Sequence, residues 1–203
     1  LGRFFWASLS DYIGRKNTYF IFFSFGIMLY SSIPFFAYQV SISPEVVWLV
    51  CFYAVTMLIF TMYGGGFATI PAYLADIFGT KFVGGIHGRL LTAWSTAGVI
   101  GPLAITTLRE RSVTEAIRGL VTDLDPALFH RTFGADLDKL DLLVETQTVT
   151  IQKLMDIAPI GTIDPTPHLY NDTMYLMAFL LFLALVANFM VTPVHSKHHI
   201  KEA

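Results

Sequence analysis

The stretch from Thr18 to Val40, TYFIFFSFGIMLYSSIPFFAYQV, decides the class of fold. It holds 23 residues without one formally charged side chain. A helix needs about 20 apolar residues to cross a hydrocarbon core about 30 Å thick, so this stretch is long enough to span a bilayer. Gly26 and Pro34 lie within it, and membrane helices tolerate both when neighbouring groups satisfy the freed backbone.

Three more stretches have the same apolar character. They run from Val46 to Ala72, from Ile86 to Leu108 and from Met174 to Val194. Of the 203 residues, 54% are hydrophobic and 14% are charged, whereas soluble domains carry about 25% charge. The sequence therefore predicts an all-α fold of polytopic membrane helices. The low share of charged residues excludes a soluble enzyme and a nucleic-acid binder. The single cysteine, Cys51, excludes a disulfide scaffold.

The basic residues of the short connecting segments predict the orientation. They are Arg15 and Lys16 in the first segment, Lys81 and Arg89 around the third, and His195, Lys197 and Lys201 in the tail. The second turn, 41–45, has no lysine or arginine. By the positive-inside rule we expect the basic segments in the cytoplasm, with residues 195–203 as a cytoplasmic tail of a multi-pass protein in the cell or inner membrane.

The segment 109–172 is then predicted to lie outside the cytoplasm as a small helical insert. It carries six basic and eleven acidic residues. Ser112 to Glu115 fits a capping box, and Asp125 followed by Pro126 fits a helix start. Apolar stripes at helical spacing follow at Leu137, Leu140 and Val144 and at Ile151, Leu154 and Met155. A disordered loop is the alternative, which the stripes disfavour.

Arg3 is the charged residue expected deepest in the membrane. Eight residues separate it from Asp11, about 12 Å along a helix, which is close to the midplane of the hydrocarbon core. A charged side chain at that depth faces a water-filled cavity or a partner. Its guanidinium offers a planar fork of donors to a carboxylate. The alternative is a structural arginine paired with an acid elsewhere in the protein.

Two aromatic residues reach the same depth on other helices. Tyr63 lies eight residues before Pro71, and Trp94 lies eight residues after Ile86. The glycines 64–66 beside Tyr63 let helices approach closely or bend. We therefore predict a substrate site formed by Arg3, Tyr63 and Trp94, with simple packing as the alternative for both aromatics. Asn188 in the last span is expected to form hydrogen bonds between helices.

The most specific motif is Ser10-Asp11-Tyr12-Ile13-Gly14-Arg15-Lys16. Asp11 at this turn can cap a helix or pair with an arginine and so latch neighbouring helices. The motif resembles the cytoplasmic loop of the major facilitator superfamily, Gly-x-x-x-Asp-x-x-Gly-Arg-Lys, with Ala7 in place of the first glycine. That resemblance implies the C-terminal part of a 12-helix fold, preceded by an N-terminal half.

The superfamily's helix order can be carried onto this chain. Residues 1–108 would be the end of helix 8 followed by helices 9, 10 and 11, and 109–172 would be the insert. Residues 173–194 would be helix 12. The gating motif would comprise Asp11, Gly14, Arg15 and Lys16. Asp76 and Lys81 are predicted as a second latch, with an exposed loop pair of little energetic value as the alternative.

A narrower resemblance is to the oxalate:formate antiporter family. It rests on the stretches 2–6, 75–81 and 92–93. In that family an arginine of helix 8 and a lysine of helix 11 bind a dianion. Arg3 matches the arginine, whereas Trp94 stands where the lysine is expected. One cation favours a monoanion, so the resemblance implies secondary active transport of formate, lactate or pyruvate rather than oxalate.

The partners expected are therefore a small carboxylate, membrane lipid, and either a coupled proton or a counter-anion. No nucleic acid, metal or cofactor is expected. Enzymatic activity is not expected either, because the spans lack a buried acid, a histidine pair or a Ser–His arrangement. His195, His198 and His199 are predicted to belong to a cationic tail rather than a metal site. The alternative function is a membrane receptor or scaffold that binds a partner through 109–172.

Overall fold

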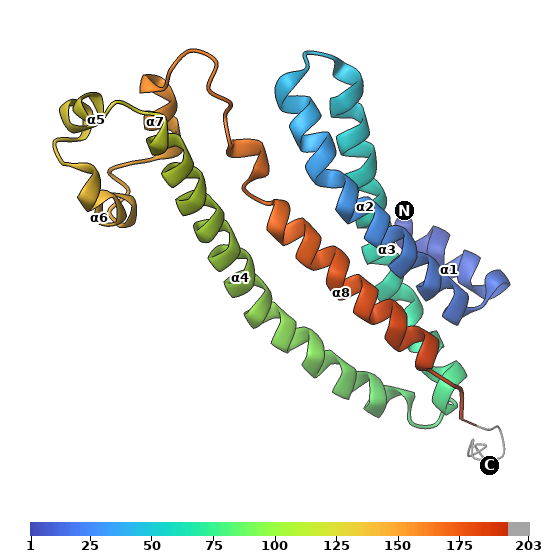
Figure 1. The fold of residues 1–203 in the computed structure, drawn as a ribbon. Helices are drawn as coiled ribbons and strands as arrows, with labels where there is room; N and C mark the ends of the chain where they lie inside the picture. The colour runs from blue at the N-terminus through green and yellow to red at the C-terminus, as the bar shows by residue number, and fades with distance from the viewer. Residues whose placement is uncertain (195–203) are drawn as a thin grey trace. The chain divides into compact units, whose positions relative to one another are not determined.

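The computed structural model describes residues 1–194, and this part of the chain is all helical, with 82% helix and no strand. The long helices are α2 (Arg15–Ile42), α3 (Val46–Phe78), α4 (Val83–Thr122) and α8 (Asn171–Met190). A shorter helix, α1 (Gly2–Ile13), precedes them (Figure 1). The prediction of an all-helical chain with four long apolar helices is confirmed.

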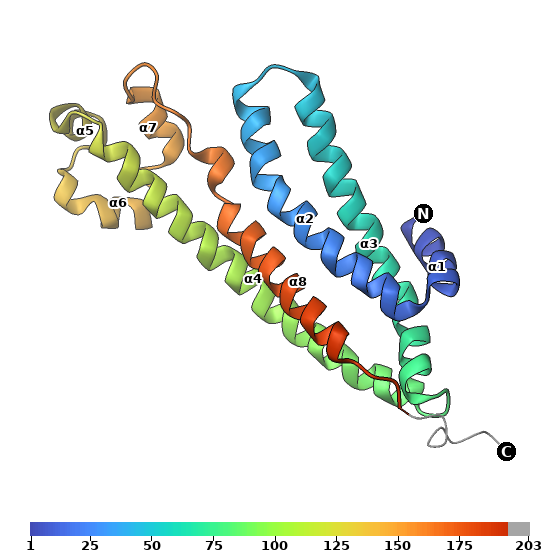
Figure 2. The ribbon, with the colours of Figure 1, turned by 45° about the vertical axis from the view of Figure 1, so that its right-hand side comes forward.

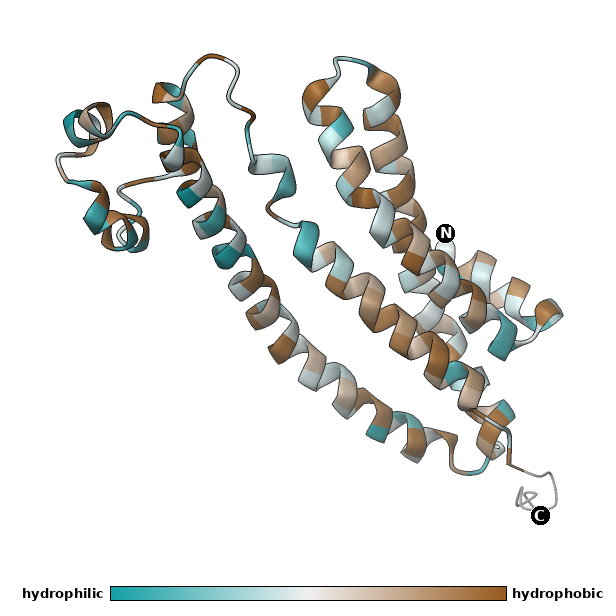
Figure 3. Ribbon diagram, viewed as in Figure 1, coloured by the Kyte–Doolittle hydropathy of each residue, from teal (hydrophilic) through white to brown (hydrophobic). Residues whose placement is uncertain are grey.

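These four helices have the length and composition needed to cross a membrane. In the most apolar 18-residue stretch of each helix, between 0% and 22% of the residues are buried. Large apolar side chains therefore cover the outside of the helices. Figure 3 shows this hydrophobic colouring along α2, α3 and α8. Such a surface is stable in a lipid environment and not in water. The composition and the helices therefore agree on a membrane protein.

The chain divides into two compact units. The first contains Leu1–Leu103 together with residues 174–194, and the second contains Ala104–Thr173. The boundary between Leu103 and Ala104 falls within α4, so each unit includes a part of that helix.

Close packing of α1 on α3 organises the first unit. Gly14, with φ +86°, is the single residue between α1 and α2, and it lets the chain turn sharply. A Cβ atom on Gly65 would lie 2.6 Å from Cβ of Trp6, so only glycine permits this approach. The indole of Trp6 also donates a hydrogen bond to Thr61 Oγ1 at 3.3 Å. The close helix approach predicted for glycines 64–66 is confirmed at Gly65, whereas a Cβ on Gly66 would meet nothing within 4 Å.

Helices α2 and α3 run side by side and share an apolar core (Figure 2). Phe22 and Leu29 of α2 are buried against Met62 of α3. The Tyr19 hydroxyl donates a hydrogen bond to the carbonyl oxygen of Gly66 at 2.7 Å, which ties the two helices together.

The second unit folds around its own apolar core. Its short helices are α5 (Pro126–Phe133), η1 (Leu137–Lys139), α6 (Leu140–Glu145), α7 (Ile151–Ile157) and η2 (Thr166–His168). Phe129 and Leu154 are fully buried beside Ile117 from the last turns of α4. The Asp125 carboxylate accepts a hydrogen bond from the Ala127 backbone N–H at 3.0 Å, which confirms the predicted helix start.

Two predicted helix boundaries were wrong. Ser112 and Glu115 lie in the middle of α4 and cap no helix start. No glycine or proline occurs between residues 103 and 118, and Arg111 pairs with Glu115 one turn on, so the helix continues. Helix α3 likewise runs to Phe78, with Pro71 inside it rather than near its end.

Candidate functional site

A cavity of about 430 Å³ lies in the first unit, lined by α2, α3 and the first part of α4, with Leu181 contributed by α8. Its wall is mostly apolar and aromatic. The aromatic side chains include Tyr30 of α2, Tyr63 and Phe67 of α3, and Trp94 of α4. This volume falls in the range of about 300–1,000 Å³ that is typical of small-molecule sites.

Helix α4 lines the cavity with one of its faces. His87, Leu90, Leu91 and Trp94 follow each other at the spacing i, i+3, i+4 and i+7, which places all four on one helix face. The ring centroid of Trp94 lies 3.9 Å from that of Phe67 and 6.3 Å from that of Tyr63. Two of the three predicted substrate residues, Tyr63 and Trp94, are thus in contact at the cavity wall.

The third predicted substrate residue, Arg3, lies outside this wall. Its side chain is exposed on α1, and its Cγ atom lies 3.5 Å from the position that a Cβ on Gly64 would take. Gly64 follows Tyr63 directly, but successive residues of a helix point about 100° apart. Within residues 1–194 no acidic side chain pairs with Arg3.

One polar atom of the cavity has no partner among the described residues. Nδ1 of His87 is buried and forms no hydrogen bond there. Buried polar atoms are almost always satisfied, so an orphaned one in a cavity wall needs an explanation. His87 is the second residue of the apolar stretch from Ile86 to Leu108, a position that by itself indicates no role. The signal that could have identified it is its spacing of seven residues from Trp94.

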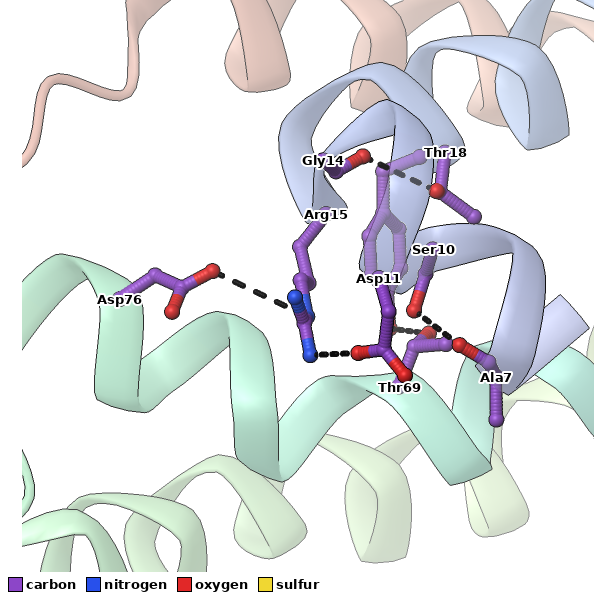
Figure 4. A network of polar contacts seen from close by, with 9 residues as sticks. Ala7, Ser10, Asp11, Gly14, Arg15, Thr18, Thr69 and Asp76 are labelled. Carbon is purple, nitrogen blue, oxygen red and sulfur yellow. Dashed lines mark hydrogen bonds and ion pairs between the residues drawn. The ribbon is translucent and has the colours of Figure 1, made fainter.

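A second group of polar residues gathers where α1, α2 and α3 meet (Figure 4). Arg15 pairs with Asp11 one turn earlier, and its Nε atom lies 3.8 Å from Oδ2 of Asp76 on α3. Gly14 lies at the bend between the helices that carry Asp11 and Arg15. Of the two residues predicted as a second latch, Asp76 contacts Arg15. The Nζ atom of Lys81 instead lies 5.8 Å from the ring centroid of Phe82.

The same region holds the end of α8. The Lys16 ammonium donates hydrogen bonds to the carbonyl oxygens of Val191 at 2.6 Å and Phe189 at 3.3 Å. A cation is favourable at the C-terminus of a helix, where carbonyl groups lack partners. Asn188 accepts a hydrogen bond from the Tyr73 hydroxyl at 2.8 Å and donates one to the Lys16 carbonyl at 3.2 Å. The prediction that Asn188 bonds between helices is confirmed.

No metal site is visible in the part of the chain that the structure describes, where no group of three or more His, Cys, Asp or Glu side chains is placed to hold an ion. The predicted cytoplasmic tail, 195–203, lies outside the described residues.

Comparison with known proteins gives no relative: no family model, no curated protein and no solved structure matches this chain.

Proposed function

We propose that this chain is the C-terminal part of a secondary transporter of the major facilitator type, which moves a small monocarboxylate by alternating access. The observation that carries the proposal is the open cavity at which Tyr63 and Trp94 meet, bordered by helices of membrane length. Transporter sites of this class lie near the midplane of the bilayer, between helices. Tyr63 lies about 22 Å from the end of α3 at Phe78, and Trp94 lies about 16 Å from the start of α4 at Val83, so both are well inside helices of membrane length.

Arg3 is the proposed fixed charge for the substrate carboxylate. It lies at the level of Tyr63, beside Gly64, and it has no acidic partner within residues 1–194. A single fixed cation matches a single negative charge. Formate, lactate or pyruvate is therefore favoured over oxalate, and a coupled proton or a counter-anion completes the cycle.

The polar contacts at the helix ends are the proposed cytoplasmic gate. Arg15 joins Asp11 to Asp76, and Lys16 holds the last carbonyls of α8. The carboxylates of Asp11 and Asp76 are more than half exposed, so each pair is worth about 0–1 kcal/mol. Contacts this weak are suited to a gate that opens and closes in every cycle. Gly14 forms the bend between α1 and α2. Lys81 would add a third basic side chain to Arg15 and Lys16 on the proposed cytoplasmic side.

Uptake into proteoliposomes tests the role of Arg3. We expect Arg3→Gln in the full-length protein to reduce lactate uptake at every pH, because the carboxylate would approach the apolar cavity without a fixed cation beside it. The matched control is Arg131→Gln, the same substitution at an exposed position of the second unit. Wild-type uptake by Arg3→Gln would overturn the role of Arg3, and faster uptake of oxalate than of the three monocarboxylates would overturn the charge argument.

Cysteine labelling tests the proposed orientation. In a Cys51→Ser background, Thr132→Cys in the second unit should react with a membrane-impermeant maleimide added outside intact cells. Thr80→Cys, beside Lys81, should react only after the cells are opened. The opposite pattern would contradict the positive-inside assignment and the extracytoplasmic insert.

A second candidate function is a receptor or scaffold that binds a partner through the segment 109–172. The observation that favours it is the separate core of the second unit, with Phe129 and Leu154 fully buried. Deleting this segment separates the two functions. Loss of a binding partner with unchanged lactate uptake would support docking, whereas a transporter without a docking role should lose no partner.

A further inference from the structure

His87 points to the species that travels with the anion. It lines the cavity from α4, on the same helix face as Trp94 and seven residues before it, about 10 Å along the helix. It is the fifth residue of α4, about 6 Å from the helix start, and so lies near the end of the helix rather than in its middle. In the cycle proposed below, protons would reach the imidazole from that end of the helix.

The wall around His87 supplies no compensating charge. Among the described residues that line the cavity there is no lysine, arginine, aspartate or glutamate. The titratable side chains facing it are Tyr19 and Tyr30 from α2 and Tyr63 from α3, and α8 contributes only Leu181. Tyrosine hydroxyls keep their protons throughout the physiological pH range.

Charged groups near this end of the first unit are already engaged or lie outside the cavity wall. Asp76 of α3 contacts Arg15 of α2. Lys81 lies beside Phe82 before α4 begins, and Arg89 is exposed and does not line the cavity. Among the described residues that line the cavity, His87 is the one whose side chain can accept a proton and become positively charged.

Because Arg3 lies outside the cavity wall, a carboxylate that moves along this wall needs a positive charge that arrives with it. Moving an isolated carboxylate from water into apolar surroundings is strongly unfavourable, and pairing with a proton or a cation removes most of that cost. The orphaned Nδ1 of His87 is a ready acceptor for such a proton. Once protonated, it becomes an N–H donor to the carboxylate.

We propose that His87 is the proton-carrying residue of the cavity and that the transporter is a proton–monocarboxylate symporter. The inference rests on the proposed transport function and adds the coupling to it. One proton binds to Nδ1 and forms an N–H bond, and the carboxylate binds to the resulting imidazolium. After the cavity opens to the other side the anion leaves, and the same N–H bond breaks to release the proton. One anion and one proton cross together, so no net charge moves.

The pH dependence of uptake tests this assignment. The full-length protein is reconstituted in proteoliposomes, and uptake of radiolabelled L-lactate is measured between about pH 6 and about pH 8, with protein-free vesicles subtracted and the membrane potential clamped. We expect uptake to fall as the pH rises, by up to about ten-fold per pH unit, the limiting slope for one proton per anion. His87→Gln should flatten this slope whatever its absolute rate. His130→Gln, at an exposed histidine of the second unit, should keep it.

A measurement on the unmodified protein keeps the test independent of how the variant folds. Adding lactate to the purified protein in weakly buffered detergent at about pH 8 should remove up to about one proton from solution for each lactate bound. No proton uptake, a slope in His87→Gln equal to that of the wild type, or lactate uptake that does not depend on pH would each overturn the role of His87. Absence of any uptake of lactate, formate and pyruvate would overturn the proposed function itself, and the symport with it.

Discussion

The contact between Gly65 and Trp6 gives the most direct test of how α1 packs on α3. A Cβ atom added at Gly65 would lie 2.6, 2.7 and 2.8 Å from Cβ, Cγ and Cδ1 of Trp6. The Trp6 Cβ is fixed to its own backbone, so rotating the indole does not relieve the overlap and α1 itself must shift. That shift also strains the Trp6 hydrogen bond to Thr61 and its edge-to-face contact with Phe22 at 4.9 Å.

The size of the effect follows from two opposing contributions. Overpacking of this kind costs about 1–3 kcal/mol. Alanine in place of glycine inside a helix recovers about 0.5–1 kcal/mol. Gly65→Ala should therefore destabilise the protein by about 0.5–2 kcal/mol.

The neighbouring glycine provides the matched control, because a Cβ on Gly66 would meet nothing within 4 Å. Gly66→Ala should keep the helix gain without the clash. Thermal unfolding of both full-length variants in detergent measures the difference. Each kcal/mol is worth about 2–4 °C in chains of about 150–250 residues, so the midpoint of Gly65→Ala should be several degrees lower. An equal or higher midpoint for Gly65→Ala would refute the packing described for α1 and α3.

Three further predictions concern the other contacts. Asn188→Leu should lower stability by about 1–2 kcal/mol in the same unfolding assay, because it leaves a buried hydroxyl and a carbonyl without their partner. Asp76→Asn should change stability by less than about 1 kcal/mol, and a double-mutant cycle with Arg15→Gln should give a coupling no larger than that. Leu154→Ala should cost about 2–5 kcal/mol and expose the second unit to limited proteolysis, whereas Leu142→Ala, on a side chain that is 59% exposed, should leave cleavage unchanged.

Much of the fold could be predicted because its strongest signals are local. The charge-free run beginning at Thr18 needs no tertiary information to be recognised as a long apolar helix, and α2 extends beyond it by only a few residues. Asp125 and Pro126 fix a helix start through the Asp125 carboxylate, which caps the helix, and the restricted backbone of the proline. Ser112 to Glu115 shows the limit of such signals, because a capping pattern has no effect where the surrounding residues already continue a helix.

The candidate site was predicted less completely, since residue counting gives depth along a helix and not the direction of a side chain. Arg3, Tyr63 and Trp94 were assigned one depth. Tyr63 and Trp94 do meet, but Arg3 lies against Gly64 and outside the cavity wall. Which face of α3 each neighbour contacts depends on how α1 and α4 pack against it, and a single sequence carries no direct signal for that.

His87 was missed for a related reason. A histidine near the end of an apolar span is ordinarily satisfied by water or by a neighbouring backbone group, so its position alone indicates no function. Its significance comes from two facts that appear only in three dimensions: its Nδ1 atom is buried without a partner, and it shares a cavity with Tyr63 and Trp94.

Arg3 and His87 would have different duties in the proposed cycle, because one charge is permanent and the other is not. A guanidinium stays protonated at every accessible pH and remains with the protein, so it can raise affinity for an anion but cannot carry charge across the membrane. An imidazole can gain and lose a proton within each cycle, so it can couple the anion to a proton gradient. Arg3→Gln should therefore reduce uptake at every pH, whereas His87→Gln should change how uptake depends on pH. If Arg3→Gln and His87→Gln both lowered uptake by the same factor at every pH, the separate roles proposed for the two residues would be wrong.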